Sequence, residues 1–192
     1  MPEQLRVPVH DLAREGKVFA VAASPKHRFS KPARREIQLV KGYGVEGDAH
    51  AGSFVRHRYL ARRQPNLPNL RQVHLIPCEL FEALQTNGHD VEPGALGENI
   101  TTAGLDLERM PLRTRIQLGA AAMVELTGLR TPCMLIDRFQ RGLKQLLISS
   151  QEIGPPFHCG VMAVVTAGGR VTPGDPVLVL LPEGTPSALP HL

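Results

Sequence analysis

The pattern of apolar and polar positions along the chain predicts many short strands. Short apolar runs recur, some with alternating polar positions, and glycine, proline or asparagine residues bound most of them. Such runs are typical of buried or half-buried β-strands. The predicted strands cover residues 17–22, 37–40, 72–76, 98–102, 116–118, 122–126, 161–165 and 177–180.

Two segments have the spacing of a helix face instead. The first begins at Pro77 and stops at Asn87-Gly88. Its apolar face consists of Leu80, Phe81 and Leu84. The second begins near Pro132, and its predicted apolar face consists of Leu135, Phe139, Leu143 and Leu146. Many strands with two or more helices predict a mainly β fold, either a barrel or a strongly curved mixed sheet.

Composition narrows the class of protein. The 192 residues suffice for one domain with a real core, and the 42% hydrophobic content is ordinary for a globular protein. Aromatic residues make up only 4%, without tryptophan, which argues against base stacking on single-stranded nucleic acid. The net charge of +4 favours an acidic or phosphorylated ligand, although a solvated basic surface gives the same charge.

Cysteine usage indicates a reducing compartment. Cys78, Cys133 and Cys159 form an odd set without short spacing, which fits neither a disulfide framework nor a zinc site. The chain has no segment resembling a signal peptide and none apolar enough to span a membrane. We therefore expect a cytoplasmic protein.

Cys133 is the residue with the most distinctive chemistry. If Pro132 occupies the first helical turn, the Cys133 sulfur lies near unpaired backbone N–H groups and the positive end of the helix dipole, with Arg130 close by. Such surroundings favour the thiolate, which attacks electrophiles and binds metals. The alternative is a buried, inert cysteine. We expect Cys78 to serve packing, because Glu79 opposes its ionisation.

The stretch from Gly94 to Thr102 is the second candidate. It lacks the glycine pattern of a dinucleotide-binding turn and the Lys-Ser/Thr ending of a P-loop. Its backbone N–H groups, with Glu98 and Asn99, can line an anion or a pterin-like ring. The alternative is a structural turn that Asn99 ties down. Our central hypothesis is that this stretch meets Cys133 in space and forms a site for an anionic cofactor.

Two further stretches carry charged or titratable groups. Asp48 and His50 lie between glycines and are either a general acid/base pair or a turn cap beside a surface imidazole. The basic segment 56–71 is either a phosphate-binding loop or a solvated face. The residues alone leave both alternatives open.

Taken in order, these stretches resemble the MOSC domain, named for the C-terminal domain of molybdenum-cofactor sulfurase. The segments that carry the resemblance are 44–52, 71–75, 93–102, 104–107, 129–133, and 160–165 through 173–175. The resemblance divides the chain into a lead-in of residues 1–16, a MOSC domain of residues 17–181 and a proline-rich tail of residues 182–192.

The resemblance implies a β-barrel-like fold with a strongly bent sheet, and it implies a molybdenum cofactor. The characteristic cysteine of the family maps to Cys133, which ligates molybdenum in members studied as reductases. The resemblance also places Asp48 and His50 at the site, and we assign all three residues to the chemistry. Expected cofactor contacts are Arg71, Gly97, Glu98, Asn99, Thr101 and Arg130. No pyridoxal-phosphate site is expected.

The expected function is reduction of N-hydroxylated compounds by a molybdenum-cofactor-dependent oxidoreductase. Its partners would be a small-molecule substrate and an external redox partner. One alternative is a sulfur carrier that receives persulfide sulfur on Cys133 from a cysteine desulfurase. Another is a non-catalytic module that binds an anionic ligand or nucleic acid through the basic loop 56–71. We expect neither a membrane nor a nucleic acid as partner, and whether the chain forms a homodimer stays open.

Overall fold

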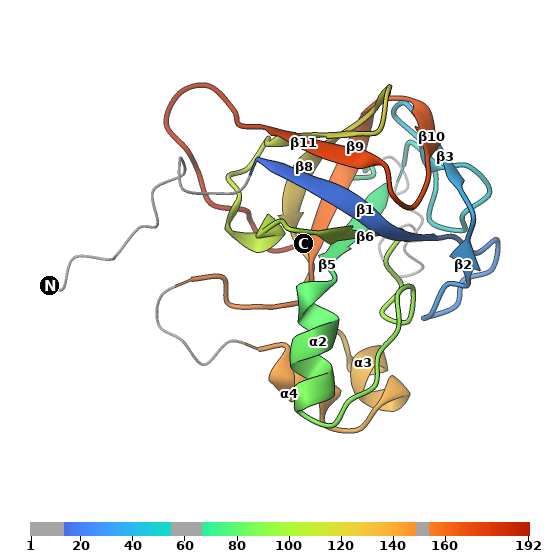
Figure 1. The fold of residues 1–192 in the computed structure, drawn as a ribbon, viewed down its shortest axis with the longest axis vertical. Helices are drawn as coiled ribbons and strands as arrows, with labels where there is room; N and C mark the ends of the chain where they lie inside the picture. Colours follow the sequence, from blue (N-terminus) through green and yellow to red (C-terminus); the bar gives the residue numbers. More distant parts are fainter. Residues whose placement is uncertain (1–13, 55–66, 149–153) are drawn as a thin grey trace, which may run out of the picture.

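The computed structural model describes residues 14–54, 67–148 and 154–192, and in these ranges the main body is a closed mixed β-barrel (Figure 1). The seven strands follow the order β11-β7-β8-β9-β5-β6-β1, and β11 pairs back to β1. Only β5 and β6 run parallel within the barrel. The strands are β1 Glu15–Ala22, β5 Val73–Pro77, β6 Ile100–Ala103, β7 Arg115–Leu118, β8 Ala122–Leu129, β9 Val161–Ala167 and β11 Pro176–Leu180. The mainly β, barrel-like prediction is therefore confirmed.

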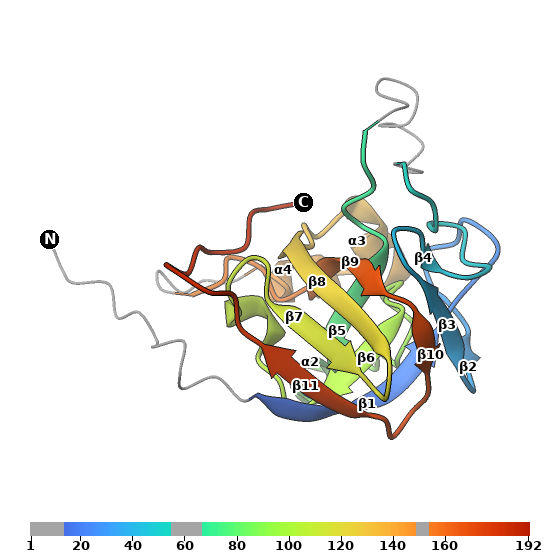
Figure 2. The same ribbon diagram turned by 90° about the horizontal axis from the view of Figure 1, so that it is seen from above.

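A small sheet flanks the barrel (Figure 2). It contains β10 Gly169–Val171, β3 Ile37–Val40 and β4 Gly44–Val45, in that order. The short strand β2 Ala33–Arg34 pairs with the end of β1. The chain between β1 and β2 and the turn after β4 both lead into the candidate site described below.

The helices lie at one end of the barrel, drawn at the bottom of Figure 1. They are α2 Glu79–Thr86, α3 Met134–Phe139 and α4 Leu143–Leu146, and a 3₁₀ turn, η2, covers Leu107–Arg109. The first predicted helix is confirmed as α2, which buries Phe81 and Leu84. Asn87 is its C-cap, and Gly88 follows with φ +83°, a left-handed conformation that suits glycine.

The face predicted for the second helix is wrong. The extended Gln140 ends α3, and Gly142, with φ +85°, precedes α4, so one helical phase does not run through the segment. Of the four residues expected to be buried, only Leu143 is, whereas Leu135 is 44% and Phe139 38% exposed. Leu146, the fourth, is 40% exposed. Ile136 and Leu147 take the buried positions instead.

The buried apolar side chains form two clusters. The larger fills the barrel, and Leu189 from the C-terminal segment also packs into it. The C-terminal segment runs along β8, where the Leu192 N–H donates to the Leu129 carbonyl at 2.9 Å. The smaller cluster joins the barrel end to the helices and contains Ile76, Phe81, Leu84, Val91, Leu96, Ile136, Leu143, Leu147 and Cys159.

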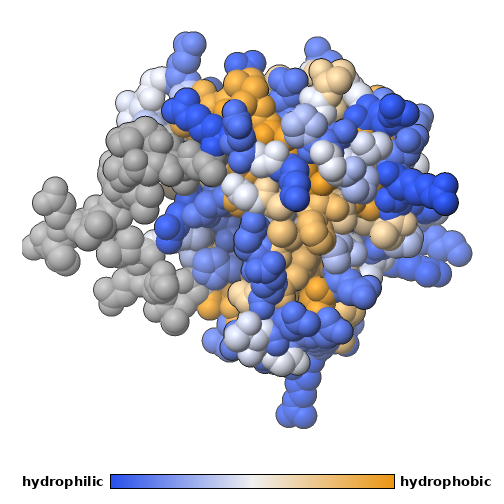
Figure 3. Space-filling view, viewed as in Figure 1, coloured by the Kyte–Doolittle hydropathy of each residue, from blue (hydrophilic) through white to orange (hydrophobic). Residues whose placement is uncertain are grey.

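The surface adds little to the assignment of function. None of the helices in the described ranges is long and apolar enough to cross a membrane. The face in Figure 3 is mainly hydrophilic, with apolar side chains exposed through its middle. Among the exposed apolar residues of the strands are Phe19 on β1 and Leu178 on β11. Scattered exposed residues of this kind are normal in globular proteins.

Candidate functional site

A pocket of about 360 Å³ lies among the loops that enter and leave the barrel strands. Its lining brings together Gly97 and Asn99 from one predicted stretch and Arg130 and Cys133 from the other. The apolar part of the lining consists of Phe29, Leu96, Leu135 and Met162. The basic and imidazole side chains are His27, Arg28, Lys31, His50, Arg71, His74 and Arg130. The pocket therefore combines one thiol with a strongly cationic wall.

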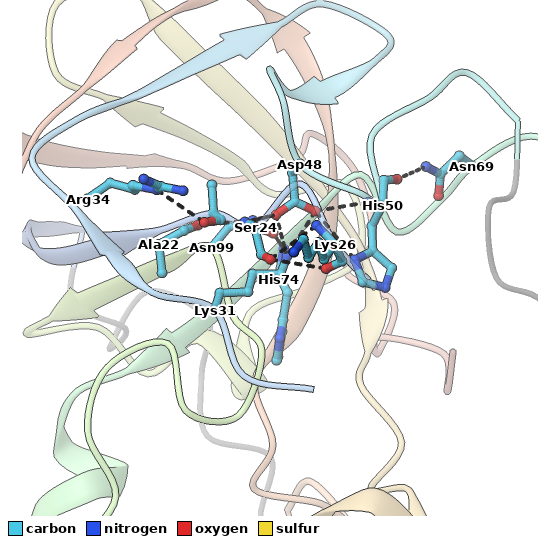
Figure 4. Close-up of polar contacts among 11 residues, drawn as sticks. Ala22, Ser24, Lys26, Lys31, Arg34, Asp48, His50, Asn69, His74 and Asn99 are labelled. Atoms are coloured by element: carbon cyan, nitrogen blue, oxygen red, sulfur yellow. Dashed lines mark hydrogen bonds and ion pairs between the residues drawn. The ribbon is translucent and has the colours of Figure 1, made fainter. Parts of the chain in front are cut away.

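Asp48 is the centre of the polar network beside this pocket (Figure 4). Its carboxylate accepts the backbone N–H groups of Ser24 at 3.1 Å and His50 at 2.9 Å. The Asn99 side-chain amide donates to Oδ2 at 3.2 Å. Burial alone would raise the pKa of Asp48, but the hydrogen bonds from His50 and the charge of Lys31 hold that pKa well below its usual range. Asp48 is thus a buried, ionised anchor and is not itself part of the pocket lining.

Lys31 is the most deeply buried cation among the pocket residues that the sequence did not indicate. Its ammonium lies 3.0 Å from Asp48 Oδ2, and the two side chains are only 4% and 2% exposed. Burial lowers the pKa of Lys31, and the attraction of Asp48 opposes that shift. In the sequence Lys31 stands between Ser30 and Pro32 in a polar connection, where a lysine is ordinarily a surface residue. No local pattern distinguishes it.

Two arginines of the pocket, Arg71 and Arg130, have no matching acid among the described residues. Burial lowers the pKa of Arg71, and the neighbouring charge of Arg130 lowers it further. Burial also lowers the pKa of His74 well below its usual range, so this imidazole is neutral. Among the described residues, neither Arg71 nor Arg130 pairs with a carboxylate. Mutually repelling cations in a pocket are typical of a site for an anionic ligand.

Cys133 lies at the start of α3, but not as predicted. It is the N-cap residue, with extended backbone angles of φ −100° and ψ 168°, so Pro132 precedes the cap and does not occupy the first turn. Its half-buried side chain lines the pocket and packs against the cluster that contains Cys159. Arg130 directs its Nη1 toward Cys159, 2.6 Å from that sulfur.

The other two cysteines lie outside the pocket lining. Burial raises the pKa of Cys78, and Glu79 raises it further, which agrees with the expected packing role. Burial also raises the pKa of Cys159. His158 does not pair with Cys159, because its Nδ1 lies 3.0 Å from Glu108 Oε2.

Glu98 and Thr101, both expected to contact a cofactor, do not line the pocket. Glu98 is fully buried, and its Oε1 accepts the N–H of Gly94 and, at 3.4 Å, the hydroxyl of Thr101. Burial raises the pKa of Glu98. The carboxyl group therefore braces the turn from within, while Gly97 and Asn99 form the side that faces the pocket.

Hydrogen bonds within the protein hold the Asn99 side chain, and His50 lies beside Asp48. The Asn99 side-chain amide donates to the Ala22 carbonyl at 3.2 Å as well as to Asp48. Its Oδ1 accepts the backbone N–H of His74 at 3.3 Å. His50 Nδ1 lies 3.4 Å from Asp48 Oδ1, and its half-exposed ring lines the pocket. The Asp48–His50 pair is therefore at the site, with His50 as the member that a ligand can touch.

The basic loop 56–71 falls mostly outside the described residues, including Arg56, Arg58 and Arg62. Only its last part is described, and there Arg71 lines the pocket. The described residues contain no group of three His, Cys, Asp or Glu side chains arranged to hold a metal ion. Cys133 is the pocket's single thiol.

The structure thus combines a closed mixed barrel with a pocket that holds a thiol and clustered cations. The MOSC domain model matches residues 61–178, and the chain belongs to this family. A comparison with curated protein sequences gives no match.

Solved structures share the fold. The YuaD protein from Bacillus subtilis is 21% identical, covers 88% of this chain and 97% of its own, and superposes with a TM-score of 0.69. YiiM from Geobacillus stearothermophilus is 17% identical, and the match covers 90% of this chain and 79% of the YiiM chain with a TM-score of 0.66. YiiM from Escherichia coli is 19% identical, and the match covers 91% of this chain and 74% of the YiiM chain with a TM-score of 0.57.

Proposed function

We propose that this MOSC protein binds a molybdenum cofactor in the pocket and reduces N-hydroxylated compounds. Cys133 is the metal ligand in this proposal. The observation that carries it is the placement of one half-buried thiol in the same lining as Lys31, Arg71 and Arg130. A molybdenum-pterin cofactor has the two matching features, a metal that accepts a soft sulfur donor and an anionic phosphate.

The residues present fit such a group. A single thiolate suffices where the metal already carries the dithiolene sulfurs of its pterin. The cavity volume of about 360 Å³ lies within the range of small-molecule sites. The cofactor, when bound, supplies a two-electron redox centre. Arg71 and Arg130 are the residues assigned to its phosphate, because no carboxylate among the described residues neutralises them.

The remaining roles belong to this chain's own side chains. Asn99 shapes the wall on the pterin side, because its amide is fixed by hydrogen bonds to the backbone and to Asp48. His50 offers a half-exposed ring to a bound ligand, and its Nδ1 lies 3.4 Å from Asp48 Oδ1. The proposal also requires a small-molecule substrate and a separate electron-donor protein.

The decisive experiment measures cofactor content. The full chain is produced in a host that makes the cofactor, and molybdenum and pterin are measured per chain. We expect bound cofactor in the wild type and a loss of most molybdenum in Cys133→Ser. Cys78→Ser is the matched control, since that thiol is partly buried but lies outside the pocket lining. Absence of molybdenum from the wild type, or equal content in Cys133→Ser, would sink the proposal.

The same preparation tests the sulfur-carrier alternative. It is incubated with a cysteine desulfurase and cysteine, and the mass of the peptide containing Cys133 is measured. One added sulfur on Cys133 in a protein without molybdenum would replace the reductase proposal with sulfur transfer. With molybdenum bound, reduction of an N-hydroxylated amine by a chemical electron donor should be present in the wild type and lost in Cys133→Ser.

A further inference from the structure

Lys31 belongs to the pocket but is nearly inaccessible. Its side chain is 4% exposed, yet it contributes to the lining. The residue lies in the connection between β1 and β2, whose backbone is fixed by the turn before β6. The Lys31 N–H donates to the Gly94 carbonyl at 2.8 Å, and the hydroxyl of Ser30 donates to the Ala95 carbonyl at 2.7 Å. The position of the ammonium is thus determined from both ends of the side chain.

The ammonium has donor capacity left over. A lysine has three N–H donors. Asp48 takes up one of them in a hydrogen bond, with Nζ 3.2 Å from Oδ1, and Oδ2 lies 3.0 Å from Nζ as part of the same ion pair. Among the described residues Nζ has no other hydrogen-bond acceptor. An unused donor on a charged group in a nearly dry site is costly unless a ligand or water accepts it.

The charges around Lys31 favour an anion as that acceptor. Asp48 balances one positive charge, but Arg130 adds repulsion to Lys31 and to Arg71. Glu98 is close enough to interact with Lys31, but burial favours its neutral form and weakens its contribution. The pocket lining as a whole keeps an excess of positive charge.

We propose that Lys31 is a ligand-binding residue, which donates one hydrogen bond to an anionic oxygen of the molecule in the pocket, and that Asp48 is its positioning residue. The oxygen belongs either to a phosphate of the cofactor or to the substrate, and both sources share this chemistry. The inference extends the proposed function, but its test uses protein without cofactor. Its failure is therefore distinguishable from the failure of molybdenum binding.

The probe is inorganic phosphate, titrated into the full chain prepared from a host that cannot make the cofactor. Lysine labelled with carbon-13 at the ε position reports on each ammonium by NMR, and Lys31→Arg assigns the signal of residue 31. We expect this signal to move with phosphate concentration and to saturate. The exposed Lys26 lies in the same connection outside the pocket lining, and its signal should stay fixed.

A double variant tests the affinity. Lys31→Met alone leaves the Asp48 charge buried without its cation, so it is combined with Asp48→Asn, which removes both charges together. We expect its phosphate affinity to fall about ten- to a hundredfold, the effect of one charged hydrogen bond. Lys26→Met is the control and should bind as the wild type does. A fixed Lys31 signal, or wild-type affinity in the double variant, would overturn the inference.

Cofactor-loaded protein then assigns the oxygen to its source. Loss of pterin from the double variant places Lys31 on the cofactor phosphate. Retained pterin with a raised KM for an N-hydroxylated substrate places it on the substrate. In either case the phosphate titration, which needs no molybdenum, carries the inference independently.

Discussion

The α-carbon of Gly94 packs against the backbone carbonyl oxygen of Lys31, and a β-carbon at position 94 would overlap that oxygen. Gly94 also has φ +87°, a left-handed conformation that other residues adopt at a cost. Gly97 lies in the same way against the carbonyl of Phe29. The glycine-rich turn therefore acts on the pocket through the backbone of residues 29–31.

Gly94→Ala should destabilise the fold by more than a left-handed backbone alone explains. The backbone strain costs about 1–2 kcal/mol, and the overlap with Lys31 adds about 1–3 kcal/mol. Gly88→Ala is the matched control, because Gly88 has φ +83° but nothing within 4 Å of an added β-carbon. Urea unfolding measures both variants. Equal losses would show that the packing against Lys31 has no energetic weight.

Glu98→Gln should change how stability depends on pH. The pKa of Glu98 is raised by burial, so the folded state holds this proton more tightly than the unfolded chain. The contribution of Glu98 to stability is therefore fully present below its reference pKa of 4.5 and is lost as the pH rises through the folded pKa. Between pH 4 and pH 8 we therefore expect the wild type to lose stability relative to Glu98→Gln. Parallel unfolding curves across this range would contradict the assignment.

Glu108→Gln should lower the pKa of His158. The hydrogen bond to Glu108 is the largest cause that raises the pKa of this imidazole above 6.5. The contribution of protonated His158 to the stability of the fold is therefore present below pH 6.5 and is lost as the pH rises through the raised folded pKa. NMR titration of the ring measures the pKa directly. A titration curve that does not move in Glu108→Gln would exclude the ion pair in solution.

Two neighbouring residues on α3 test which face is buried. Ile136 is fully buried and Leu135 is 44% exposed. Ile136→Ala should cost about 2–5 kcal/mol of unfolding free energy, as large-to-small core substitutions do. Leu135→Ala should change it by about 0.5 kcal/mol, within the range of surface substitutions. The reverse order in chemical unfolding would restore the helix face that the sequence predicts.

The strands and the first helix were predictable because each carries a local signal. The runs at 37–40 and 161–165 read as strands from their own residues, and α2 has both periodic apolar positions and a glycine stop. The second helix failed because Gly142 changes the phase between two short helices. The predicted strand at 98–102 begins only at Ile100. The side chains of Glu98 and Asn99 instead accept backbone N–H groups of the turn and of β5.

The site was predictable only in part, because its chemistry depends on distant contacts. Cys133, Gly97, Asn99, Arg71 and Arg130 lie together in the pocket lining, as the order of the motifs indicated. Glu98 has an ionisable side chain, a residue type common in ligand contacts, but the surrounding fold buries it completely. Lys31 had no local signal, since its partner Asp48 is remote in sequence and close only in space.

The pairing of β1 with β11 has a consequence for synthesis of the chain. The seam joins Glu15 to Leu178, so the barrel cannot close until the chain through β11 has left the ribosome. Until then one edge of β1 lacks its partner, and open strand edges invite pairing with other chains. A nascent chain arrested or cut before residue 176 should therefore aggregate or engage chaperones, even though every pocket residue has already been made.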